Sequence, residues 1–310
     1  MKDFISIHDL SVAEVEKILN LAADLKRNPR QKLLEGKTLA LIFEKPSTRT
    51  RVSFEVGMYH LGGKTVHLSP RAVQLGVRES IADVARTLSR YVDGVMLRTF
   101  EHKNLLEFAH HASVPVINGL SDLLHPCQAL ADVFTMREKK GIGGRSREEK
   151  GLKVAYIGDG NNVCHSLMFA CAKVGLNLTI ATPKGYEPRK EIVEAAFADA
   201  KKTGIEIDIL NDPVAAASNA DVIYTDVWTS MGQEKEDKKR QAAFKKFQVN
   251  KQLVKLAKPD YIFMHCLPAH RGFEVTDWVI DSPNSVVFDQ AENRMHVQKA
   301  ILAILLGGKG

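Results

Sequence analysis

The clearest feature of the sequence is a repeated order of apolar stretch, polar loop and helix. It occurs in TLALIFEKPSTRTRVSFEVGMYHLGG (38–63) and again in LKVAYIGDGNNVCHSLMFACAKVG (152–175). In the first passage Val52, Val56 and Tyr59 recur at helical spacing. Both helical patterns end at glycine, which favours the left-handed conformation at a helix C-terminus. Each passage therefore predicts a strand, a polar loop and a helix.

Further short apolar stretches alternate with helical patterns along the chain. They are DGVMLR (93–98), VPVING (114–119), LNLTIAT (176–182), ADVIYTDV (220–227) and YIFMHCLP (261–268). Strands that alternate with helices are typical of βαβ units and parallel sheets. The pattern predicts an α/β fold.

One glycine-rich, charged stretch, KKGIGGRSREEKG (139–151), interrupts this alternation. Such segments are typical of domain junctions. We expect two doubly wound parallel-sheet domains, over 1–138 and 150–290. The last helix, 291–310, carries an apolar stripe that must be buried, and we expect it to pack back on the first domain.

Composition agrees with a two-domain globular protein. The chain has 310 residues, of which 45% are hydrophobic and 26% charged. No apolar run approaches the roughly 20 residues of a membrane span, and the first twenty residues do not resemble a signal peptide. We expect a cytoplasmic protein with no membrane contact.

The net charge of +6 does not indicate nucleic acid as a partner. Lysines are dispersed, and the one dense run, EKEDKKR (234–240), contains both signs. A small anionic substrate explains the positive excess better.

Cofactor and metal patterns are weak. The loop GDGNNV has Val163 where a dinucleotide fingerprint needs a third small residue, and no acidic residue follows the next strand, so we expect no nicotinamide cofactor. The four cysteines form no CxxC pair and are expected to be reduced thiols. Zinc ligands could be sought among His125, His165, His265 and Cys266, but their spacing matches no usual site, so we expect no metal.

The stretch STRTR (47–51) places two arginines where a helix begins, although a helix start favours negative charge. Free N–H groups, three hydroxyls and a guanidinium fork would together suit a phosphate. Alternatively, Arg49 and Arg51 are solvated and paired with Glu44 or Glu55. For Arg51 this alternative is a serious one.

Four motifs in order, FEKPSTRTRVSFEVG, LLHPCQALAD, DVWTSMGQE and MHCLPAHRG, resemble the ornithine carbamoyltransferases. The resemblance covers nearly the whole chain. It implies transfer of a carbamoyl group from carbamoyl phosphate to the δ-amine of L-ornithine, without a cofactor, in a cleft between the two domains. It also implies a homotrimer or a multiple of trimers.

The resemblance assigns site residues by motif. The carbamoyl-phosphate set is Ser47, Thr48, Arg49, Thr50, Gln74, Arg98, His125, Pro126, Cys127, Gln128, Cys266, Leu267 and Arg294, with Gln74 reaching a neighbouring subunit. The ornithine set is Asn162, Asp226, Ser230 and Met231. Arg98, His125, Asp226 and Cys266 are the expected catalytic residues.

Taken alone, several of these residues have ordinary structural interpretations. His125 would cap a helix, Cys127 would be a packed thiol, Asp226 would cap a strand end, Met231 would fill a core, and Gln74 would lie in a surface loop. A different amine acceptor is the remaining functional alternative. Aspartate would require a cation where DVWTSMGQE supplies an acid, and putrescine has no carboxylate for Asn162 to hold.

Overall fold

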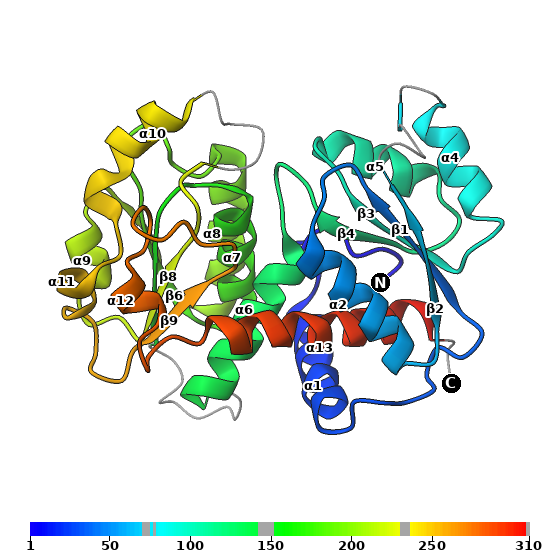
Figure 1. Cartoon of the computed structure of the whole chain (residues 1–310), viewed down its shortest axis with the longest axis horizontal. Coiled ribbons are helices and arrows are strands. Elements are labelled where there is room, and N and C mark those ends of the chain that lie inside the picture. Colours follow the sequence, from blue (N-terminus) through cyan, green and yellow to red (C-terminus); the bar gives the residue numbers. More distant parts are fainter. Residues whose placement is uncertain (70–74, 77–78, 142–151, 230–235, 308–310) are drawn as a thin grey trace. The chain divides into compact units, whose positions relative to one another are not determined.

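A computed structural model describes residues 1–69, 75–76, 79–141, 152–229 and 236–307 (Figure 1). It divides into two compact units. Unit 1 comprises Met1–Ala131 and Glu292–Gly310, and unit 2 comprises Asp132–Ala291. Each unit has a parallel sheet with helices, so the predicted α/β class is confirmed.

Unit 1 is built on a four-stranded parallel sheet of order β2-β1-β3-β4. The strands are β1 Thr38–Phe43, β2 Lys64–Leu68, β3 Gly94–Arg98 and β4 Val116–Leu120. The accompanying helices are α1 Val12–Arg27, α2 Thr48–His60, α4 Ile81–Leu88 and α5 His102–His111, with parts of α6 Pro126–Lys140 and α13 Val287–Leu306. The strand order reverses between β1 and β3, and ligands of open α/β sheets bind at such a reversal, outside the carboxyl ends of the strands.

Unit 2 is built on a five-stranded parallel sheet of order β7-β6-β5-β8-β9. Its strands are β5 Lys153–Ile157, β6 Asn177–Ala181, β7 Ile207–Leu210, β8 Val222–Thr225 and β9 Ile262–His265. Its helices are α7 Asn162–Val174, α8 Lys190–Thr203, α9 Pro213–Ala217, α10 Asp237–Phe244, η3 Lys245–Phe247, α11 Lys251–Val254 and α12 Asp277–Ile280. The order reverses between β5 and β8, which is the corresponding ligand position.

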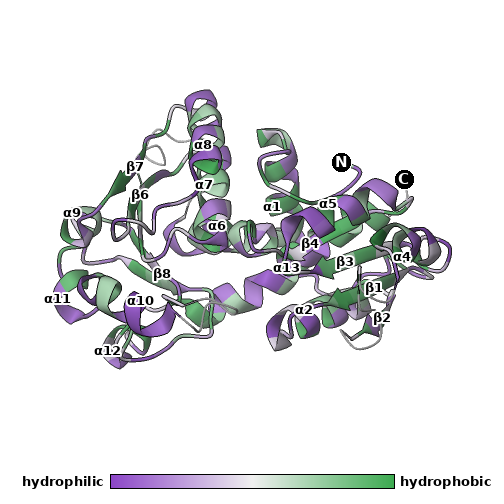
Figure 2. Ribbon diagram, turned by 90° about the horizontal axis from the view of Figure 1, so that it is seen from above, coloured by the Kyte–Doolittle hydropathy of each residue, from purple (hydrophilic) through white to green (hydrophobic). Residues whose placement is uncertain are grey.

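Each apolar stretch of the sequence contains a strand, and Figure 2 shows strands such as β1 and β3 as mainly hydrophobic while α10 is mainly hydrophilic. Strands β2 and β7 were not expected. Both lie at a sheet edge, and both carry partly exposed polar residues, so neither has a continuous apolar run.

Helix α2 forms as predicted, but two of the apolar residues that indicated it in the sequence, Val52 and Tyr59, lie on its exposed face. Val52 is 50% exposed and Tyr59 71% exposed. The buried positions are Thr50, Phe54, Gly57 and Met58. A Cβ on Gly57 would lie 3.3 Å from the Lys299 Cγ of α13, so this glycine lets the two helices approach closely.

The boundaries between the two compact units fall after Ala131, within α6, and after Ala291, within α13. Residues 142–151 of the predicted junction lie outside the described residues. The bounds 1–138, 150–290 and 291–310 stay predictions. Within the described ranges, no helix has the length and apolar character needed to cross a membrane.

Helix α13 brings several polar side chains into the interior. The Lys299 ammonium donates hydrogen bonds to the carbonyl oxygens of Leu25 and Pro29, each 2.8 Å away. Gln298 is fully buried, and neither atom of its side-chain amide has a hydrogen-bond partner in the part of the chain that the structure describes. Burying an unpaired amide is unfavourable.

Replacing this amide by an apolar group of similar size removes that cost. We predict that Gln298→Met stabilises the protein by about 1 kcal/mol, which corresponds to roughly 2 °C in Tm. Differential scanning calorimetry measures the change. A lower Tm would show that the amide has a stabilising partner.

Candidate active site

The start of α2 in unit 1 has the features of an anion site. Ser47 caps the helix by accepting a hydrogen bond from the Thr50 N–H at 3.3 Å, and the first turn contains no acidic residue. The two arginines differ. Arg51 is exposed and donates to Glu55 at 3.0 Å, whereas the Nε of Arg49 is buried and has no hydrogen-bond partner within the described ranges. The surface interpretation therefore holds for Arg51 and fails for Arg49.

Two further guanidiniums meet at Thr50, whose side chain is fully buried. The Thr50 Oγ1 lies 3.3 Å from Arg98 Nη1 and 2.8 Å from Arg294 Nη2. Arg98 ends β3, where the register to β4 shifts and redirects the strand end. Arg294 comes from α13, so residues far apart in sequence form one cationic group.

His125 lies beside this cationic group and is almost fully buried. Burial and the guanidiniums of Arg294, Arg98 and Arg49 hold the pKa of its imidazole well below the ordinary value. The ring is therefore neutral near pH 7, and a neutral imidazole can donate one N–H to a carbonyl oxygen.

The next residues begin α6. Pro126 occupies its first position, and the buried Gln128 follows. Burial raises the pKa of the Cys127 thiol to about 12, and its Sγ contacts the Asn118 carbonyl oxygen at 3.4 Å. The structure therefore agrees with a packed thiol at Cys127 and gives it no nucleophilic character.

In unit 2 the carboxyl ends of the adjacent strands β5, β8 and β9 carry the polar residues. Asn161 caps α7, with its Oδ1 accepting from the backbone N–H groups of Val163 and Cys164 at 3.0 and 3.1 Å. Its Nδ2 donates to Asp226 Oδ2 at 2.8 Å. The predicted site residue Asn162 is the first residue of the same helix. The sequence indicated two asparagines at a helix start, but not that the first one orients Asp226.

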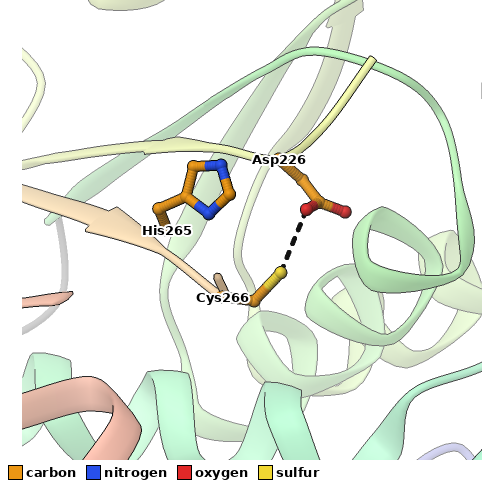
Figure 3. Close-up of side chains that lie close together, drawn as sticks. All are labelled: Asp226, His265 and Cys266. Carbon is orange, nitrogen blue, oxygen red and sulfur yellow. Dashed lines mark hydrogen bonds between the residues drawn. The ribbon is translucent and has the colours of Figure 1, made fainter. Parts of the chain in front are cut away.

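The second oxygen of Asp226 faces the thiol of Cys266 (Figure 3). Sγ lies 3.0 Å from Oδ1, so the thiol donates its proton to the carboxylate. Each oxygen of Asp226 retains acceptor capacity. Asp226 with a neutral thiol beside it can hold an amine or ammonium group.

His265 fixes the turn that carries Cys266. Its Nδ1 accepts from the Leu267 N–H at 2.9 Å, and its Nε2 lies 3.1 Å from Glu274 Oε1. The network therefore assigns the proton to Nε2. Leu267 has φ 57°, an uncommon conformation for leucine, and this hydrogen bond holds it there.

Potential ligand atoms of Asp226, His265 and Cys266 lie within 4.8 Å of one another. Zinc coordination would need a free imidazole lone pair and a thiolate. Both ring nitrogens of His265 have partners, and the Cys266 thiol donates to Asp226. The side chains of Asp226, His265 and Cys266 therefore fit a hydrogen-bonded network and do not fit a zinc site.

Arg240 connects the loop after β5 to the loop after β8 through hydrogen bonds. Its Nη1 donates to Asp159 Oδ2 at 2.9 Å and to the Trp228 carbonyl at 2.8 Å. Burial raises the pKa of Asp159 to about 6 although Arg240 opposes that rise. The run EKEDKKR gave no sign that its last residue would be buried, because every neighbour in it is polar.

The structure thus groups the predicted residues of each unit separately. In unit 1 it brings together Ser47, Arg49, Thr50, Arg98, His125 and Arg294, with Thr48 exposed at the helix start. In unit 2 Asp226 and Cys266 meet, with Asn162 and Leu267 on adjoining segments. Gln74, Ser230 and Met231 lie outside the described residues. Sequence reasoning missed Glu274 and Arg240, which carry no motif.

These features define a two-domain α/β enzyme with a phosphate-suited site on one domain and an amine-suited site on the other. Residues 2–138 match the carbamoyl-P binding domain of aspartate/ornithine carbamoyltransferase, and residues 150–305 match the Asp/Orn binding domain. The chain belongs to the aspartate/ornithine carbamoyltransferase family.

Individual relatives are consistent with this family assignment. The chain is 58% identical to the ornithine carbamoyltransferase of Thermococcus kodakarensis, over 99% of this chain and 97% of that protein. The structure of ornithine carbamoyltransferase from Pyrococcus furiosus is similar with a TM-score of 0.95 and 56% identity, over 100% of this chain and 98% of the other. An acetylornithine transcarbamylase complexed with acetylcitrulline has a TM-score of 0.89 and 32% identity, over 99% and 100%.

The two arginines of α2 provide a matched test of the anion site. Arg49→Gln is expected to weaken binding of inorganic phosphate at least about tenfold, because the Arg49 guanidinium, whose Nε is buried, can donate a charge-assisted hydrogen bond to the anion. Arg51→Gln is expected to change it less than about twofold, because Arg51 is paired at the surface. Isothermal titration calorimetry measures both. Equal losses would contradict the assignment.

His125 provides a pH test. Because its folded pKa lies below the unfolded value of 6.5, the unfolded chain binds more protons just below pH 6.5. Stability therefore decreases as pH falls from about 6.5 towards the folded pKa, and His125→Asn is expected to reduce that slope. Denaturation at a series of pH values measures it, and NMR of the ligand-free protein should show no His125 titration near pH 6.5.

Proposed function

We propose that this chain transfers the carbamoyl group from carbamoyl phosphate to the δ-amine of L-ornithine, giving L-citrulline and phosphate. The observation that carries the proposal is the convergence of Arg49, Arg98 and Arg294 beside a neutral His125. That convergence suits a ligand with a phosphate and a carbonyl oxygen. Family membership and the ornithine carbamoyltransferase relatives support the acceptor.

The phosphate would lie at the start of α2. Ser47, Thr48, Arg49 and Thr50 would hold it with Arg98 and Arg294, as guanidinium forks and helix N–H groups do for phosphates. Arg98 and His125 would donate to the carbonyl oxygen, where negative charge develops during attack. Gln128 would hold the carbamoyl nitrogen. Pro126 and Cys127 complete the proposed set through their place in the motif.

The amine would lie at the ends of β8 and β9. Asp226 and the Cys266 thiol would orient the amino groups, and the Leu267 carbonyl would meet the carbamoyl nitrogen. We assign the α-carboxylate to Asn162 and to the segment containing Ser230 and Met231. Orientation of the two substrates and stabilisation of charge would supply the catalysis.

The reaction needs no redox step. The deprotonated δ-nitrogen donates its lone pair to the carbonyl carbon, and the bond from that carbon to the phosphate oxygen breaks. Phosphate leaves with that electron pair and can take up the proton lost by the attacking nitrogen. Because only the neutral amine is nucleophilic, its protonation limits the rate at low pH.

Assembly and location rest on the family resemblance. We propose a homotrimer, or a multiple of trimers, in the cytoplasm. In that assembly Gln74 would reach the carbamoyl phosphate of a neighbouring subunit. We propose no nucleic-acid or membrane partner and no cofactor.

The test is a citrulline assay with purified protein. L-Ornithine and carbamoyl phosphate are expected to give citrulline, with a rate that rises from pH 6 to 9 in folded protein. N-acetylornithine, whose α-nitrogen is uncharged, and putrescine, which lacks a carboxylate, are expected to react at least about 100-fold more slowly, equivalent to about 2.7 kcal/mol. Faster turnover of either amine, or a rate that falls across this pH range, would contradict the proposal.

A further inference from the structure

A buried glutamine joins the end of β9 to α6. Gln290 is fully buried in α13, and its Oε1 accepts a hydrogen bond from the His265 backbone N–H at 3.0 Å. Its Nε2 donates to Asp132 Oδ1 at 2.7 Å and lies 3.2 Å from Tyr224 Oη. The carbonyl end therefore faces a donor and the amide end faces a carboxylate, which fixes the orientation of the amide.

The backbone of His265 needs this partner because the sheet ends there. Thr225 and His265 form the last pair between β8 and β9. Beyond that pair the chain leaves the ladder, and a buried N–H without a partner is costly. Gln290 supplies the acceptor at this position.

The turn that follows depends on His265. Its ring accepts from the Leu267 N–H, and Cys266, which lies between them, donates to Asp226. A displacement of the His265 backbone would therefore move both the thiol and the left-handed Leu267. Gln290 acts at the first residue of this turn and does not itself reach Asp226 through any described hydrogen bond.

Asp132 and Tyr224 keep the amide of Gln290 in place. Both are fully buried, and the Tyr224 hydroxyl donates to Asp132 Oδ2 at 3.1 Å. Burial, together with the nearby Asp132, raises the pKa of Tyr224 well above its ordinary value, so the phenol keeps its proton. Asp132 accepts from Tyr224 and from Gln290, one on each oxygen, and so prevents the amide from rotating.

We propose that Gln290, oriented by Asp132, is a positioning residue that sets the Cys266 thiol and the Leu267 backbone for the amine substrate. This inference rests on the proposed function. It predicts that Gln290 affects the use of ornithine much more than the affinity for carbamoyl phosphate, because most of the proposed carbamoyl phosphate contacts come from unit 1.

Gln290→Met removes the hydrogen bonds to His265, Asp132 and Tyr224 at nearly constant volume. We expect kcat/KM for ornithine to fall at least about tenfold, with the Kd of carbamoyl phosphate changed less than about twofold. Gln290→Glu is the conservative variant, because a protonated carboxyl group can accept from the His265 N–H and donate to Asp132. We expect it to retain kcat/KM for ornithine within about threefold at pH 7.

Gln298→Met is the matched control, since Gln298 is an equally buried glutamine of α13 whose amide has no partner within the described residues. It is expected to keep both constants. Wild-type kinetics in Gln290→Met, equal losses in Gln290→Met and Gln290→Glu, or a parallel loss of carbamoyl phosphate affinity would each overturn the inference, because none is expected of a positioning residue.

If Gln290→Met does not fold, Gln290→Asn replaces it. Its amide is shorter by one methylene and cannot span from His265 to Asp132, so a loss of several-fold in kcat/KM for ornithine is expected; unchanged kinetics would overturn the inference. The citrulline assay on wild-type protein separates the two proposals. Wild-type protein that makes no citrulline contradicts the proposed function, whereas active wild-type protein with an equally active Gln290→Met contradicts only the role of Gln290.

Discussion

Two guanidiniums share one buried threonine hydroxyl and act with a third on one buried imidazole, and this charge cluster is the constraint on which the site in unit 1 depends. Two like charges 4 Å apart repel by about 4 kcal/mol at the effective dielectric constant of a protein surface. The first turn of α2 offers no acid to offset this repulsion. A dianionic ligand at the helix start would convert it into attraction, and the same field keeps His125 neutral and able to donate to a carbonyl oxygen.

In unit 2, hydrogen bonds hold a carboxylate and a thiol in place for an amine. Asp226 is held by a donor on each oxygen, the Asn161 amide and the Cys266 thiol. His265 uses both ring nitrogens to hold the turn after β9. This arrangement leaves a carboxylate with spare acceptor capacity beside a neutral thiol, which suits an amine that must lose its charge before it reacts.

Part of this could be predicted from the sequence. Apolar stretches and polar loops located the strands and placed STRT, Arg98, Asp226 and Cys266 at strand ends, because parallel strands bring those ends to one edge. The sequence could not separate Arg49 from Arg51, since burial decides between them. The helical spacing of Val52 and Tyr59 predicted that α2 forms, but not which of its faces is buried: these two residues are exposed, and the buried face contains a threonine and a glycine.

The buried residues that hold the site residues in place could not be predicted from motifs or from hydrophobic periodicity. Arg240 lies in a run of charged residues, and Glu274 and Gln290 resemble ordinary polar residues, yet all three are buried. Their roles follow from partners distant in sequence, such as Asp159 for Arg240 and Asp132 for Gln290. Tertiary contacts of this kind leave no local signal.

The central claim is that the arginine group of unit 1 binds a phosphate as its dianion. Phosphorus NMR of an inert phosphonate analogue of carbamoyl phosphate, titrated with pH while bound, tests it most directly. We predict that the second pKa of the bound phosphonate falls by more than about one unit from its free value, because the guanidiniums favour the dianion. An unchanged pKa in the bound state, or no binding, would contradict the account.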